Sequence, residues 1–259
     1  MAEEAIMEQK TETAEQFNLE EMTGAGLQFG HKTSKTHPKM KPYVASVRNT
    51  VHLINLEKTR EKLQEAFGAV CELVAQGKVV LLVGTKVQAK GAVRELAEAT
   101  GLPYVTERWI GGLLTNFESV SKRIAHLKDL EQKKQGEEFQ KYTKWEQLQM
   151  EEEIQRLTKK FGGVKTLERL PEAMFIFDLD KNELAQKEAK LKGIKVFALC
   201  DTDLDPMSVD YAIPANDDAV SSIKYIAEKL KEAILKVKST PSSDGVPSRM
   251  TGQTPHSDV

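Results

Sequence analysis

The amino-acid sequence predicts an α/β protein in which helices cover both faces of a parallel sheet. Two observations lead to this class. Short, continuously apolar segments alternate with amphipathic helical patterns between residues 51 and 238, and such alternation is typical of buried parallel strands. One stretch, 117–161, interrupts the alternation with two helical stripes of apolar residues, which predicts an antiparallel helical hairpin inserted between two strands.

The first half of the alternation contains three expected strands and two expected helices. Gly77 and Gly101 end the helices, since glycine readily adopts the left-handed conformation found at helix ends. Leu63, Phe67 and Val70 share one face of the first helix, which indicates the side that packs on the sheet. The expected elements are a strand over 51–56, a helix over 57–76, a strand over 79–83, a helix over 86–100 and a strand at 104–105.

The second half repeats the pattern after the hairpin. Gly193 separates a helix from the next strand, and Asp217, after Asn216, stands where a capping residue of the last helix is expected. The expected elements are a strand over 174–177, a helix over 182–192, a strand over 195–199, a short strand over 211–213 and a helix over 217–238.

The length of 259 residues suits one large domain with an insertion, or two small domains. We expect an α/β domain over 18–116 and 162–238, with the helical hairpin over 117–161 inserted into it. Residues 1–17 form an expected flexible acidic arm, because glutamates far outnumber the single lysine there. The expected disordered tail, 239–259, has too few apolar side chains to offset the entropy of ordering.

Composition argues against membrane-bound and secreted proteins. No apolar run approaches the ~20 residues that a membrane-spanning helix needs, and the N-terminus resembles neither a secretory signal nor a transit peptide. Cys71 and Cys200 lie among apolar residues and share no metal-ligand spacing with histidines, so we expect buried, reduced thiols. The sequence predicts a cytoplasmic protein.

Charge is segregated along the chain, although the net charge is only −2. The stretch from His31 to His52 contains basic residues and no acid, and recognition of a polyanion depends on such a local field. Prolines 38 and 42 favour an extended chain that would follow a phosphate backbone, with Phe29 and Tyr43 free to stack on bases. A solvated basic loop is the alternative. The candidate RNA-binding residues here are His31, Lys32, Lys35, Lys39, Lys41, Arg48 and Asn49.

A second candidate RNA-binding segment follows the strand at 104–105. Consecutive glycines let a backbone approach a partner closely, while arginine and tryptophan supply charge-assisted contacts and stacking. A place for Trp109 in the core is the alternative. The candidate residues are Arg108, Trp109, Gly111, Gly112, Asn116, Lys122 and Arg123.

Two enzymatic interpretations compete with RNA binding. The strand-to-helix junction over 79–86 carries glycine, threonine and lysine but lacks both glycine-rich nucleotide-binding motifs, so a tight turn is the simpler interpretation. A magnesium-dependent phosphotransferase using Asp178, Asp201 and Asp203 is the second, because these residues follow strands at the edge where ligands usually bind. Aspartates that cap turns are its alternative, and no nucleophile with an adjacent base is evident.

Three groups of motifs follow one another with few gaps from about Phe17 to Leu235. The N-terminal group is Gly26–His31, Pro38–Met40, Arg48–Asn49 and Leu56–Thr59. The central group is Val83–Ala89, Tyr104–Val105, Arg108–Gly112 and Leu114–Phe117. The C-terminal group is Leu170–Pro171, Asp178, Asp201–Thr202, Asp205–Pro206, Val209–Tyr211 and Ile213–Asp218. Together these motifs resemble those of the bacterial ribosomal protein S-two family. Four residues depart from the family pattern: Thr36-His37 replaces Trp-Asn, Thr50 replaces a common glycine, and Asp203 replaces asparagine.

The resemblance implies a flavodoxin-like sheet with an inserted coiled-coil hairpin. It also implies a structural, non-enzymatic constituent of the small ribosomal subunit that needs no cofactor or metal. The implied partners are small-subunit ribosomal RNA and neighbouring ribosomal proteins, including the large messenger-RNA-binding protein S-one. A hairpin that docks a protein partner is a further hypothesis for residues 117–161.

Overall fold

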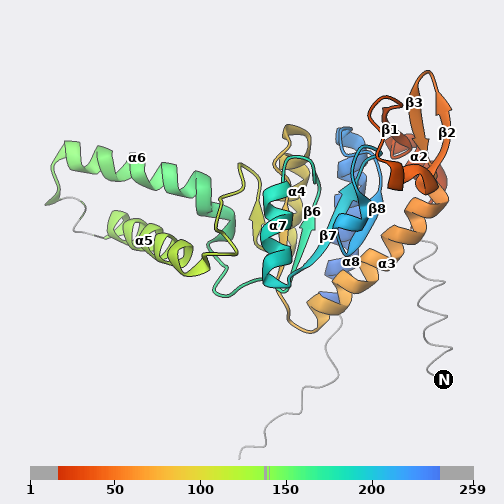
Figure 1. Cartoon of the computed structure of the whole chain (residues 1–259). Coiled ribbons are helices and arrows are strands. Elements are labelled where there is room, and N and C mark those ends of the chain that lie inside the picture. Colours follow the sequence, from red (N-terminus) through yellow and green to blue (C-terminus); the bar gives the residue numbers. More distant parts are fainter. Residues whose placement is uncertain (1–16, 137–138, 140, 240–259) are drawn as a thin grey trace, which may run out of the picture.

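Five parallel strands form the central sheet, in the order β5-β4-β6-β7-β8 (Figure 1). The strands are β4 (Val80–Val83), β5 (Tyr104–Val105), β6 (Ala173–Ile176), β7 (Lys195–Cys200) and β8 (Tyr211–Pro214). This computed structural model describes residues 17–136, 139 and 141–239, so the expected arm, except Phe17, and the tail beyond residue 239 lie outside the described residues. The expected α/β class with a parallel sheet is confirmed, and the order is consistent with a flavodoxin-like fold.

Helices cover both faces of this sheet. Val80 and Leu82 point to one face, where they pack with α3 (Leu56–Ala75), α4 (Val87–Thr100) and α8 (Val220–Ser239). The alternate residues, Leu81 and Val83, point to the other face and pack with α7 (Glu183–Lys192). All four residues of β4 are fully buried, because both faces are covered. This explains why the strands are continuously apolar in sequence.

The N-terminal residues build a separate lobe rather than extending the central sheet. Strands β1 (Phe29–Lys32), β2 (Val44–Arg48) and β3 (Val51–Ile54) form an antiparallel sheet in the order β1-β3-β2, and we call residues 29–54 the N-terminal lobe. Helix α2 (Leu19–Ala25) precedes it. The expected strand over 51–56 therefore exists, but it is antiparallel and outside the parallel sheet. Its apolar pattern does not specify which strand it pairs with.

The expected extended stretch over Pro38–Tyr43 is wrong, because these residues form the 3₁₀ helix η1. The imidazole of His37 accepts a hydrogen bond from the Lys39 backbone N–H at 3.4 Å, and Pro38 occupies a position where no N–H is needed. Met40 points inward and is fully buried. The proline-fixed φ angle suits a helical turn as well as an extended chain, so the prolines alone did not decide between them.

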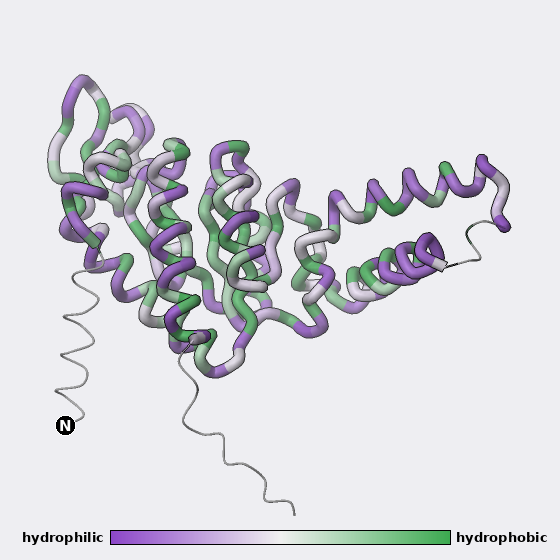
Figure 2. The backbone as a smooth tube through the Cα atoms, turned by 180° about the vertical axis from the view of Figure 1, so that it is seen from behind, coloured by the Kyte–Doolittle hydropathy of each residue, from purple (hydrophilic) through white to green (hydrophobic). Residues whose placement is uncertain are grey.

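Two long helices, α5 (Phe117–Gln135) and α6 (Lys144–Phe161), extend side by side away from the sheet (Figures 1 and 2). Salt bridges join them, including Lys134 to Glu151 at 2.8 Å. Thr143 and Glu146 begin α6 with a capping box, in which each side chain accepts a hydrogen bond from the backbone N–H of the other residue. After α6, the 3₁₀ helix η3 (Gly162–Val164) leads back to the sheet; a further 3₁₀ helix, η4 (Pro206–Ser208), follows β7. The buried apolar residues of the pair are Val120, Ile124, Leu127, Leu130, Leu157 and Phe161.

A two-residue turn joins β2 and β3, and its backbone explains one departure from the family pattern. Asn49 and Thr50 both have positive φ, 50° and 65°, between the paired residues Arg48 and Val51. Positive φ at both central residues is the requirement of a type I′ hairpin turn, which asparagine and glycine satisfy best. Thr50 is β-branched and therefore strained in this conformation.

Replacing Thr50 with glycine is expected to stabilise the protein. Relief of the left-handed strain, about 1–2 kcal/mol, exceeds the extra chain entropy of glycine, so we expect the free energy of unfolding to rise by roughly 0.5–1 kcal/mol. Urea denaturation monitored by circular dichroism measures the change. Ser46→Gly, an exposed position in the extended strand β2, is the control and should lower stability. A Thr50→Gly variant no more stable than the natural chain would contradict the strain argument.

Candidate nucleic-acid interface

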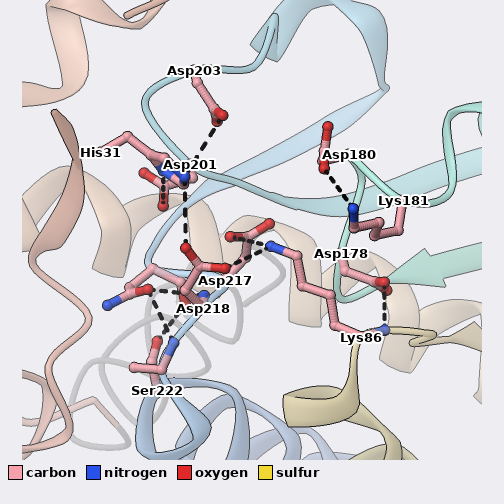
Figure 3. Close-up of polar contacts among 12 residues, drawn as sticks. His31, Lys86, Asp178, Asp180, Lys181, Asp201, Asp203, Asp217, Asp218 and Ser222 are labelled. Atoms are coloured by element: carbon pink, nitrogen blue, oxygen red, sulfur yellow. Dashed lines mark hydrogen bonds and ion pairs between the residues drawn. The ribbon is translucent and has the colours of Figure 1, made fainter. Parts of the chain in front are cut away.

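The loops that follow the five parallel strands all lie at the carboxyl edge of the sheet, where open α/β folds usually bind ligands. The N-terminal lobe docks on this same edge (Figure 1). The polar residues that meet here are shown in Figure 3 and come from β1, from the β4–α4 junction and from the ends of β6, β7 and β8. The N-terminal lobe, the loop after β5 and the residues of both predicted enzymatic sites therefore lie at or beside this edge.

His31 links the lobe to the end of β7. Its Nδ1 lies 2.8 Å from Asp201 Oδ2, and its Nε2 lies 3.6 Å from a carboxylate oxygen of Asp218 and 3.8 Å from one of Asp203 (Figure 3). The close contact with Asp201 raises the pKa of His31 from 6.5 to about 9, and this outweighs the opposing effect of burial. His31 is therefore protonated at neutral pH and committed to an intramolecular ion pair.

Backbone contacts beside His31 make the docking specific. The His31 N–H donates to Thr202 Oγ1 at 2.9 Å, and the His37 N–H donates to the Thr202 carbonyl at 2.8 Å. A Cβ atom on Gly30 would lie 2.6 Å from Thr202 Cγ2, so a larger residue cannot fit without displacing the lobe. Gly30 and Thr202 thus fix the position of the whole lobe on the sheet.

Lys86 holds the neighbouring carboxylates. Its Nζ lies 2.9 Å from Asp217 Oδ1 and 2.9 Å from Asp218 Oδ1 (Figure 3). Asp217 is 1% exposed, and burial raises its pKa to about 6 even though Lys86 acts in the opposite direction. The expected capping role of Asp217 is wrong: Asn216 Oδ1 accepts from the backbone N–H groups of Asp218 and Ala219. No sequence pattern indicates the lysine partner of Asp217, because Lys86 lies 131 residues away along the chain.

Asp178 has a structural role at the turn between β4 and α4. Its carboxylate accepts hydrogen bonds from the backbone N–H groups of Thr85 and Lys86 and from the Thr85 hydroxyl, at 2.8–3.1 Å. Among the described residues, the potential metal ligands that lie close enough together are His31, Asp201 and Asp218. The set expected for a phosphotransferase, Asp178 with Asp201 and Asp203, is not that group.

Glu188 organises the loop after β5, and sequence reasoning missed it. Its carboxylate accepts from the indole Nε1–H of Trp109 at 3.2 Å and from the backbone N–H groups of Gly112, Leu114 and Thr115 at 2.8–3.2 Å. Burial by itself would raise the pKa of Glu188, but these donors hold it below its ordinary value. A carboxylate on the buried face of α7, beside Ala185 and Ala189, was the available signal.

The predicted RNA-binding residues of the lobe fall into two groups. Lys32, Lys35, Lys41 and Arg48 are exposed, and their side chains form no ion pair within the described part of the chain. In contrast, His31 is engaged by Asp201, and Lys39 Nζ pairs with Asp205 at 2.7 Å. Asn49 is exposed at the hairpin turn.

The second predicted segment is likewise divided. Arg108, Gly111 and Asn116 are exposed, whereas Trp109 is 7% exposed and Gly112 donates to Glu188. The structure favours the core alternative for Trp109, since its indole ring packs on the second face of the sheet. On the first turns of α5, Lys122 pairs with Glu118 at 2.8 Å and Arg123 is exposed.

The fold and the carboxyl edge define a class of protein: an α/β protein with a surface that suits a polyanion. Most carboxylates at this edge are paired within the protein, and unpaired cations lie beside them.

Comparison with known proteins gives the family. The model of the family described as ribosomal protein S2 matches residues 22–237. Relatives named small ribosomal subunit protein uS2 are 49% identical in Roseiflexus sp. over 82% of this chain and 81% of theirs, and 44% identical in Chloroflexus aurantiacus over 84% and 92%. The relative in Chlorobaculum tepidum is 43% identical over 86% and 89%.

This chain belongs to the ribosomal protein S-two family. It is a structural constituent of the small ribosomal subunit, associates with the ribosome in the cytoplasm and is not an enzyme. The expected family and function are confirmed. Within the described residues, no helix combines the length and apolar character needed to cross a bilayer. Cys200 is a buried free thiol, and Cys71 is a free thiol that is only partly buried.

The His31–Asp201 contact predicts a pH-dependent stability. Because the pKa of His31 is higher in the folded protein (about 9) than in the unfolded chain (6.5), its stabilisation is fully present below pH 6.5 and is lost as the pH rises through about 9. Because solvent reaches part of the His31 side chain and screens the pair, the contribution is on the order of 1–2 kcal/mol. We expect the natural chain and a His31→Gln variant to differ most in free energy of unfolding near pH 6 and least near pH 10. Urea titrations across this range measure the difference.

His126→Gln is the matched control, because His126 is exposed on α5 and its closest carboxylate oxygen, on Glu153, lies 3.6 Å away. This variant should follow the natural chain at every pH. A constant difference between the natural chain and His31→Gln from pH 6 to pH 10 would show that His31 does not hold the lobe through its charge.

Proposed function

We propose that the N-terminal lobe binds small-subunit ribosomal RNA through its unpaired cations. The observation that carries this proposal is the exposure of Lys32, Lys35, Lys41 and Arg48 on one lobe that contains no acidic residue. The lobe is held on the sheet by Thr202 and Asp201, so its cations keep fixed relative positions. Fixed cations bind the phosphates of a folded RNA at a lower entropic cost than a mobile loop does.

The loop after β5 is proposed as a second contact. Arg108 is exposed at its start, and Glu188 fixes the following backbone through three N–H groups. Gly111 leaves the backbone accessible to a close partner. Trp109 then supports the loop from the core and does not stack on RNA. Asn116, Lys122 and Arg123 continue this proposed contact onto the first turns of α5.

A charge-removal experiment tests the lobe. Replacing Lys32, Lys35, Lys41 and Arg48 together with alanine is expected to weaken binding to small-subunit RNA and to reduce incorporation into the subunit. Each lost phosphate contact should also reduce the slope of log K against log salt by roughly 0.7–0.9, because fewer counterions are released. Filter binding between 50 and 300 mM salt measures the slope.

Two controls accompany this experiment. Lys78, Lys192 and Lys195 lie at the opposite edge of the sheet, next to the amino ends of strands, and their replacement should leave the slope unchanged. Lys39→Ala should have a smaller effect than Lys41→Ala, because Asp205 already neutralises Lys39. An unaltered slope in the fourfold variant would contradict the proposed RNA surface.

We further infer that residues 117–161 form a coiled-coil hairpin inserted into an α/β domain of residues 18–116 and 162–238. Facing apolar residues of α5 and α6 and the Lys134–Glu151 bridge support this division. Trp145 and Leu148, three residues apart on α6, are 65% and 54% exposed. Such exposed apolar pairs are typical of protein contacts. Protein S-one is the proposed partner.

Trp145→Ala combined with Leu148→Ala is expected to lower the amount of protein S-one that is retained on purified small subunits, because it removes the apolar anchors. Quantitative mass spectrometry of gradient-purified subunits measures retention. The salt dependence of RNA binding should stay unchanged. The double variant Leu191→Ala, Leu235→Ala, which removes exposed leucines from α7 and α8, is the control. Equal retention of protein S-one in all variants would show that Trp145 and Leu148 of the hairpin do not bind protein S-one.

A further inference from the structure

A cavity of about 530 Å³ opens on the carboxyl edge beside the buried Trp109. Three segments line it: the β4–α4 junction, the loop after β5 and the beginning of α7. The volume falls within the ~300–1,000 Å³ of pockets that bind small molecules or single chemical units of a polymer. The cavity is separate from the ion pairs around His31, because His31, Asp201 and Asp203 do not line it.

Two aliphatic side chains at this cavity are unusually exposed. Val87, the first residue of α4, is 84% exposed, and Leu184, on the first turn of α7, is 52% exposed. Each comes from a different segment, and both line the same cavity. Together with Trp109, these two aliphatic groups give the pocket an apolar surface that favours a flat apolar group against it. The face of a nucleic-acid base is such a surface.

The charges of the lining leave a surplus of cations. Glu107 is neutralised by Lys90 at 2.9 Å, with Arg94 at 3.9 Å, and Lys86 is engaged by Asp217 and Asp218. Arg108 forms no ion pair with any described residue. Lys181 has one carboxylate within 4 Å, that of Asp180 at 3.9 Å, and a longer-range interaction with Asp218 (Figure 3). Arg108 and Lys181 therefore remain to bind an anion, and a guanidinium binds phosphate through paired hydrogen bonds.

We propose that this pocket binds one unpaired nucleotide, with its base against Val87 and Leu184 and its phosphate on Arg108 and Lys181. The inference rests on the proposed RNA-binding function and deepens it, because single-stranded RNA is read through bases that leave the stack. The same chemistry is present in a free nucleotide. The experiment must therefore separate a nucleotide within RNA from a free one.

Methyl NMR of the full chain tests the pocket directly. The probes are a single-stranded decaribonucleotide and, separately, adenosine and uridine monophosphate at millimolar concentration. We expect the oligonucleotide to shift the methyl signals of Val87 and Leu184, and the mononucleotides to shift them only weakly. Equal shifts from mononucleotides would assign the pocket to a free nucleotide. Unchanged signals with all three probes would overturn the proposal.

Variants then separate the base from the phosphate contact. Leu184→Ser should weaken oligonucleotide binding roughly tenfold by removing apolar contact, and Arg108→Ala should weaken it by a similar factor, with partial recovery in Arg108→Lys. Leu191→Ser and Lys192→Ala, near the end of α7 and outside the pocket, are matched controls that should bind normally. Equal losses in the control variants would also contradict the proposal.

The fourfold lobe variant distinguishes a failure of the pocket from a failure of the RNA-binding lobe. If the oligonucleotide binds with a salt slope that depends on Lys32, Lys35, Lys41 and Arg48 while the Val87 and Leu184 methyl signals stay unchanged, the pocket fails and the RNA-binding lobe stands. If the oligonucleotide does not bind at low salt, both fail together.

Discussion

The docking of the N-terminal lobe on the end of β7 is the contact on which the proposed interface depends. The lobe has its own antiparallel sheet and shares no strand with the central one, so its position comes from hydrogen bonds and ion pairs rather than from sheet pairing. The Thr202 hydroxyl oxygen accepts a hydrogen bond from the His31 backbone N–H, and the Thr202 carbonyl accepts one from the His37 N–H. Gly30, which has no side chain, allows the lobe to approach Thr202 closely. Loss of these contacts would separate the cations of the lobe from the remainder of the edge.

The carboxylates of the edge explain how a chain with a net charge of −2 presents cations to a polyanion. Asp201 is paired with His31, Asp217 with Lys86, and Asp205 with Lys39, whereas Asp178 bonds backbone and hydroxyl groups. Most of their charge is thus balanced within the protein. The unpaired lysines of the lobe then determine the local field, because charges are felt over about one Debye length, roughly 8 Å at physiological salt.

Glu188 holds the loop after β5 in place, as Thr202 and Asp201 hold the lobe. One buried carboxylate receives the indole of Trp109 and three backbone N–H groups, and so it determines the shape of a loop that has no regular structure. A tryptophan beside an arginine and two glycines suggested stacking on RNA, but the ring is part of the core. Its burial leaves Arg108 at the rim of the pocket, where a nucleotide phosphate is proposed to bind.

The sequence alone determined the family, the α/β class and the boundaries of the parallel strands to within about two residues, because strands buried on both faces are continuously apolar. Tertiary structure decided the rest. Apolar periodicity does not specify a pairing partner, so the strand beginning at Val51 belongs to a separate sheet. Charge along the chain does not reveal ion pairs between distant residues, so His31 and Lys39 were counted as free cations. Their partners, Asp201 and Asp205, are more than 160 residues away and meet them only in the folded chain.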